Sequence, residues 1–218
     1  MDASILKTVP IPFTLNFNNL VIDDTVSFCL AVLFAITINS VGQAFVAISL
    51  GDKRPDEETR LHFNPVFYMD PWGLICFCLA GFGWPKYVEI KSEKFKHPRL
   101  YTIFARFGGP LANFLLANIA ASAMWIMGLF NIIDRVLPIV LIVNLTVAVY
   151  SFIPIPPLAG ASIINFFYPD KKFQSIFKDS GPIILLIIFA MEFFSNEKVL
   201  SKMLDPVVRT VFEFIVKT

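Results

Sequence analysis

The chain has 218 residues, of which 56% are hydrophobic and 16% are charged, and its formal net charge is +1. Soluble domains contain roughly 45–50% apolar and about 25% charged residues, so this composition predicts an integral membrane protein in a lipid bilayer. The small net charge argues against a nucleic-acid-binding protein. The length suits one membrane domain of a few spans, without an appended soluble module.

The first half of the chain alternates long and short apolar runs. Residues 1–25 are polar to mixed and are expected to form an extra-membrane lead-in. The run over about 26–50 is long enough for a first span through a hydrocarbon core of roughly 30 Å. The run at 72–84 is too short to span, which predicts a re-entrant or interfacial segment. Alternating side chains at 86–91 predict a short strand or hairpin.

The second half contains three more apolar runs. A second span is expected within 101–130, broken or kinked at Gly108-Gly109-Pro110. A third span is expected from Arg135 to the prolines at 154–157. The last run, 182–194, is short, and it either spans with its flanks or enters the bilayer part-way.

The C-terminal residues 196–218 repeat apolar pairs every four residues, which predicts an amphipathic helix. Asp205 and Pro206 fit an N-cap and a first helical position, so a new helix is expected to begin there. This helix either lies in the membrane interface or packs on the bundle, or it docks a partner. The chain therefore divides into the lead-in, a membrane domain at 26–195 and this helix.

Basic residues predict the orientation. The loops within 51–100 carry eight Lys or Arg, whereas the opposite side holds only Lys7 and Arg135. The positive-inside rule puts the basic loops in the cytoplasm and the amino terminus outside. We expect a multi-pass protein of the inner or plasma membrane of a prokaryote.

Polar residues interrupt the end of the first span. Asn39 and Gln43 are four residues apart and share one face of the expected helix, with Ser40 beside them. Buried amides need hydrogen-bond partners, so they indicate either helix–helix contact or a functional site. Asn113 and Asn144 in later spans are candidates to complete a polar core, whose role is mutual interhelical bonding or binding of a client or ligand.

Short motifs accompany this stretch in a fixed order: Leu50-Gly51-Asp52, Asn64-Pro65 with Asp70-Pro71-x-Gly73, Phe82-Gly83-Trp84-x-Lys86, Gly109-Pro110-Leu111-Ala112-Asn113, and Pro154-Ile-Pro-Pro-Leu158-x-Gly160. With them, the chain resembles the site-2 protease family of intramembrane zinc metalloproteases over about 31–169. The resemblance implies an all-α polytopic helical bundle with a re-entrant segment and a small β element.

The resemblance also puts the catalytic positions of the family on different residue types. The first zinc His corresponds to Asn39, the catalytic Glu to Ser40 and the second zinc His to Gln43. The third zinc ligand of the family, an Asp, corresponds to Ala159. Catalytic zinc needs about three Cys, His or carboxylate ligands and one open position for water.

Neutral amides and an alanine do not supply such ligands, and Ser40 is no carboxylate base. We therefore predict no metal, no cofactor and no enzyme. The predicted function is that of a catalytically degenerate pseudoprotease, which serves as a scaffold, adaptor or client-binding subunit for another membrane protein. Two further positions also differ: the resemblance puts a His of the family on Tyr68 and an Asn of the family on Ser151. The candidate binding residues are Asn39, Gln43, Asn113, Asn144, Ser151 and Tyr68.

Two alternatives stay open. The first is an active intramembrane metalloprotease with an unconventional site. The second is a small-molecule or ion pathway through the polar core, for which Arg106 and Glu192 are the ionisable candidates. A client would occupy the groove of the family fold, where edge-strand pairing near 86–91 would need no zinc.

Overall fold

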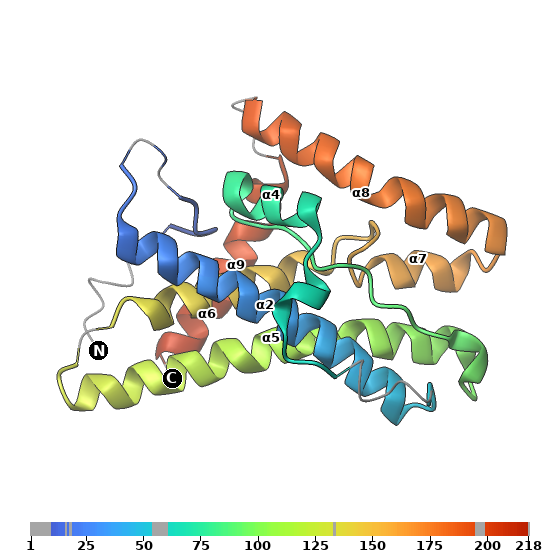
Figure 1. Cartoon of the computed structure of the whole chain (residues 1–218), viewed down its shortest axis with the longest axis horizontal. Helices are drawn as coiled ribbons and strands as arrows, with labels where there is room; N and C mark the ends of the chain where they lie inside the picture. The colour runs from blue at the N-terminus through green and yellow to red at the C-terminus, as the bar shows by residue number, and fades with distance from the viewer. Residues whose placement is uncertain are drawn as a thin grey trace.

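The computed structural model describes residues 10–15, 17, 19–53, 61–132, 134–194 and 199–217 (Figure 1). Residues 1–9, 16 and 18 of the expected lead-in lie outside this part. The described elements are α2 (Ile22–Ser49), η1 (Pro65–Tyr68), α4 (Pro71–Ala80), η2 (Ser92–Lys94), α5 (Pro98–Leu129), α6 (Val136–Tyr150), α7 (Ala161–Phe167), α8 (Lys171–Phe194) and α9 (Val199–Lys217). The predicted all-α membrane fold is confirmed.

Among the described residues, three helices are long and apolar enough to cross a membrane: α2, α5 and the part of α8 over Lys171–Met191. The helix α8 shows how the short apolar run at 182–194 reaches the length that a span needs. The helix begins at Lys171 and continues through Pro182, so its flank supplies the missing length. The apolar helix α4 has only 10 residues, too few to span, as predicted.

The third expected span is shorter than predicted. The helix α6 has 15 residues, roughly 22 Å at 1.5 Å per residue, so it is too short to cross the hydrocarbon core on its own. It contacts α2, α5 and α9, and its side chains from Ile139 to Val147 are all buried. The continuous apolar run therefore reflects a helix enclosed by protein rather than one that faces lipid.

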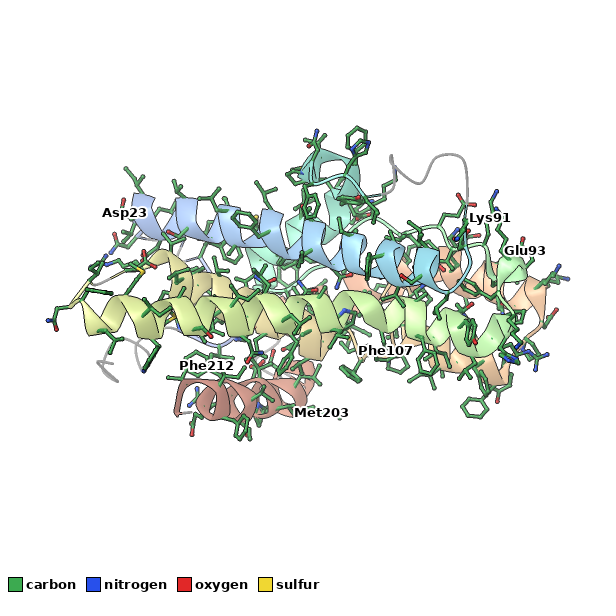
Figure 2. All side chains as sticks on the ribbon, turned by 90° about the horizontal axis from the view of Figure 1, so that it is seen from below. Asp23, Lys91, Glu93, Phe107, Met203 and Phe212 are labelled. Atoms are coloured by element: carbon green, nitrogen blue, oxygen red, sulfur yellow. The ribbon has the colours of Figure 1, made fainter. Side chains whose placement is uncertain are left out.

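The helices α2 and α5 lie side by side (Figure 2). Glycines of the two helices face each other where the helices meet. A Cβ built on Gly42 would lie 2.6 Å from the Gly108 carbonyl oxygen, and one built on Gly109 would lie 2.6 Å from Asn39 Oδ1. Small residues let helix backbones approach closely in a membrane. We expected a break or a kink at Gly108-Gly109-Pro110. The break is wrong, because α5 runs through Pro110 without interruption; the kink stays a prediction. Packing against α2 supports it there, as neighbouring helices do for proline in membrane helices.

The predicted helix start at Asp205 and Pro206 is also wrong. The helix α9 begins at Val199 and contains both residues. The Asp205 carboxylate is not free to act as an N-cap, because its Oδ1 accepts a hydrogen bond of 2.7 Å from the Tyr150 hydroxyl on α6. The apolar face of α9 packs on α6, where Val208 and Phe212 are buried.

The expected β element is not observed in the described residues. Residues 82–91 are extended but form no strand. The Lys86 amide donates to the Tyr68 carbonyl at 2.8 Å, and the Lys91 amide donates to Asp52 Oδ2 at 3.1 Å. The segment thus makes one hydrogen bond to the 3₁₀-helix η1 near its middle and one to a carboxylate at its end. No described strand continues a ladder with it.

The membrane orientation stays a prediction, which labelling can test. Lys91 and Glu93 lie at the opposite end of α2 from Asp23 (Figure 2), and α5 and α8 both begin near that end (Figure 1). In a chain lacking Cys29, Cys76 and Cys78, we expect Lys94→Cys and Lys172→Cys to react with an impermeant maleimide from one side. Arg135→Cys, in the α5–α6 loop, should react from the other side. Labelling of Lys94→Cys and Lys172→Cys from opposite sides would contradict the orientation.

Candidate functional site

Four amide side chains from three helices form one buried hydrogen-bonded group, called the amide cluster below. Asn39 Nδ2 on α2 donates to Asn113 Oδ1 on α5 at 2.6 Å, and Gln43 Nε2 donates to Asn39 Oδ1 at 2.8 Å. Asn113 Nδ2 donates to Asn144 Oδ1 on α6 and to the Ala35 carbonyl, both at 2.9 Å. Asn113 and Asn144 are fully buried. The cluster therefore joins α2, α5 and α6 at one point.

A buried cation completes this group. Arg106 Nη1 on α5 donates to Gln43 Oε1 at 2.8 Å, and the side chain is only 5% exposed. The guanidinium carbon lies 3.9 Å from the centre of the Tyr87 ring. A cation over an aromatic ring is attracted to its π-face, so Tyr87 is a second partner for this charge.

The sequence positions these residues through helix geometry. The four-residue spacing of Asn39 and Gln43 puts both amides on one face of α2. The glycines of α5 then let that face approach within hydrogen-bonding distance of Asn113, because no side chain separates the backbones. The expected polar core of Asn39, Gln43, Asn113 and Asn144 is thus assembled as one network; a role in binding stays a prediction.

The other candidate residues lie around the cluster rather than in it. Ser40 is fully buried, and its hydroxyl has no hydrogen-bond partner in the described structure. Ser151 Oγ donates to the Val147 carbonyl at 2.6 Å, and the Ser151 carbonyl accepts from Gly160 at 2.8 Å. The bond between Ser151 and Gly160 closes the turn at 151–160, called the proline turn below. This turn contains the buried Ala159. The turn borders the same pocket as Arg106 through Pro156 and Leu158.

Tyr68 belongs to η1, a separate element that packs on α2. Burial raises the pKa of Tyr68, with a hydrogen bond to the His62 backbone acting weakly in the opposite direction. The phenol therefore stays protonated at neutral pH. The side chain of Glu192, the second ionisable candidate for a pathway, lies outside the described residues.

Sequence reasoning missed the place of Arg106 and Tyr87. Arg106 was identified only as an ionisable residue near a membrane boundary, and Tyr87 only as part of an expected strand. The signal available for Arg106 was its position in an apolar run, since charged residues inside membrane helices are rare and face the bundle interior. Its partner Gln43 is 63 residues away, and no spacing rule connects the two.

The residues at the family's ligand positions do not fit a zinc ion. Asn39 Oδ1 already accepts from Gln43, and Gln43 Oε1 accepts from a guanidinium. A positive charge 2.8 Å from a ligand atom disfavours a second cation there. Ala159 supplies no donor, and the described residues contain no group of three His, Cys, Asp or Glu side chains suited to a metal.

Comparison with known proteins gives one similarity. The chain is 28% identical over 173 residues to a protein of Bacillus subtilis (strain 168) named "Putative zinc metalloprotease YwhC". The similarity is thus to a bacterial protein that carries the name of a zinc metalloprotease marked as putative. The match covers 73% of this chain and 78% of that protein. No family model and no solved structure matches the chain.

This similarity is consistent with a site-2 protease-like family, as expected from the motifs. It overturns one prediction. We expected the chain not to be an enzyme, and that expectation is wrong on this evidence, because the name of the relative points toward protease activity. The prediction weighed only the missing zinc ligands and the missing carboxylate base. The similarity extends over most of the chain, and it does not test the residue-by-residue correspondence, which stays a prediction.

Proposed function

We propose that this chain is a site-2 protease-like membrane protein that binds an apolar transmembrane segment of another membrane protein. The bound segment would lie in a groove beside the amide cluster. The proposal retains the expected client-binding role. It concerns the binding step, which a membrane protease also needs before any cleavage.

The groove is the observation that carries this proposal. It has a volume of 790 Å³ and is bordered by α2, α5, α6 and α9, and all its lining side chains are apolar. They include Val46, Phe107, Leu111, Val149, Phe152 and Val207. Leu111 is 56% exposed and Phe152 is 59% exposed, so the groove is open along α5 and α6. An apolar helix docks into such a groove through its apolar side chains.

The position of the groove beside the cluster supports a polypeptide occupant. Val46 and Gly108 line the groove, and they lie three residues from Gln43 and one from Gly109, which touch the cluster. Apolar walls next to a few convergent polar groups are typical of binding sites. The relative's name, a metalloprotease, further supports a peptide rather than a small apolar molecule.

Photo-crosslinking tests the groove directly. A photoreactive amino acid at Leu111 should form an adduct with a transmembrane segment of another protein, identified by mass spectrometry of the crosslinked peptide. Ile119 is the matched control, because it is exposed on α5 but does not line the groove. The variant Val149→Trp, which fills the groove from α6, should abolish the Leu111 adduct. Equal adducts at Leu111 and Ile119, or adducts with lipid alone, would contradict the proposal.

Cleavage of the bound segment is a second candidate function, favoured by the name of the relative. In the test, the purified protein is incubated with a tagged copy of the transmembrane segment that crosslinking has identified. We expect a fragment cut within the membrane segment, and less of it with Val149→Trp. An intact segment after incubation with wild-type protein would argue against this function while leaving the crosslinking result unchanged.

A further inference from the structure

A second pocket, separate from the groove, lies near the ends of α5 and α8 at which these helices begin. It has a volume of 290 Å³ and is bordered by the extended segment 82–91, by α5, α7 and α8, and by the proline turn. Its lining includes two cations, Arg106 and Lys178, and the hydroxyl or amide groups of Thr102, Ser162 and Gln174. None of the described lining residues is acidic.

Arg106 gives this pocket an uncompensated charge. In the described part of the chain the guanidinium forms no ion pair, and its hydrogen-bond partners are the side chains of Gln43 and Tyr87. Arginine has five N–H donors, so these two partners do not use most of its donor capacity. A buried cation is costly without a counter-charge, and such residues in membrane helices mark functional sites.

Lys178 brings a second positive charge to the same ring. Its Nζ lies 4.7 Å from the centre of the Tyr87 ring, and the Arg106 guanidinium carbon lies 3.9 Å from it. Two cations that share one aromatic ring repel each other, and Lys178 too forms no ion pair with a described residue. An anion in the pocket that both residues line would reduce this repulsion and supply the counter-charge that Arg106 lacks.

We propose that this pocket binds a phosphate group. A phosphate monoester carries about −1.5 to −2 charges at neutral pH, which matches two cations. The planar guanidinium can bind two phosphate oxygens at once, and the lysine ammonium binds as a point charge. Arg106 lies eight residues past Pro98, roughly 12 Å into α5. At that depth the phosphate could belong to a soluble molecule or to a lipid headgroup.

Binding is measured on the purified full chain in two arms. The first follows the thermal unfolding temperature with increasing inorganic phosphate against chloride at constant ionic strength. The second compares association with phosphatidic acid and with phosphatidylcholine by native mass spectrometry. We expect saturable stabilisation in the first arm if the source is soluble, or preference for phosphatidic acid alone if it is a lipid.

Lys178→Gln is the decisive variant, because Lys178 is exposed and its loss should leave the fold intact. In whichever arm shows binding, this variant should weaken phosphate binding by about tenfold, the size expected for one charge-assisted contact. Lys172→Gln is the control: it lies on the same helix, removes the same charge and does not line the pocket. It should change binding less than twofold. No phosphate binding in either arm, or equal losses in the two variants, would overturn the proposal.

Discussion

Replacing Gly42 by valine should lower the free energy of unfolding by about 3 kcal/mol, the upper part of the range for overpacking. Even a methyl group at this position would lie 2.6 Å from the Gly108 carbonyl oxygen and 2.7 Å from Ala112 Cβ. Because the Gly108 oxygen is backbone, α2 and α5 must move apart. That movement would stretch the 2.6 Å bond between Asn39 and Asn113, which lies one turn away.

Unfolding of the purified protein in detergent, by added denaturant or by steric trapping, measures this effect. Gly128→Val is the matched control, since a Cβ on Gly128 meets no atom within 4 Å. Valine is a slightly better helix former than glycine, so the control should change stability by less than about 0.5 kcal/mol. Similar losses for Gly42→Val and Gly128→Val would mean that the two helices do not depend on this contact.

Asn113→Leu should have the second largest effect, a loss of about 2–4 kcal/mol. Asn113 makes three hydrogen bonds, with Asn39, Asn144 and the Ala35 carbonyl. Interhelical bonds in membrane proteins average about 0.6 kcal/mol each, which gives the lower limit. Leaving buried donors and acceptors without partners costs about 1–3 kcal/mol per group where no water replaces them, which raises the loss.

The control for this prediction is Asn118→Leu, on the same helix. Among the described residues its amide donates only to the Phe114 carbonyl of its own helix and forms no hydrogen bond to a second helix. The double variant Asn113→Leu with Asn144→Leu should lose less than the sum of the single variants, because replacing both partners of a bond removes the unsatisfied group. Additive losses, or equal losses for Asn113→Leu and Asn118→Leu, would contradict a connected network.

Several features of the fold could be predicted from local sequence. The apolar runs predicted α2, α5 and the short α4, because membrane depth and helix rise fix the length that a span needs. The failures were at prolines, at the α6 run and at the strand expected near 86–91. Pro110, Pro182 and Pro206 all lie inside helices. A proline removes one hydrogen bond but does not end a helix that neighbouring helices hold in place.

The sequence by itself determined the membrane class, the helical content and the common face of Asn39 and Gln43, since these depend on composition and on a spacing of four residues. Only the tertiary structure decided which partners those amides have. Asn39 pairs with a residue 74 positions away, and Gln43 accepts from Arg106, 63 positions away. Both bonds exist because glycines on α2 and α5 let the two helices meet closely, and that contact depends on the packing of whole helices rather than on any local pattern.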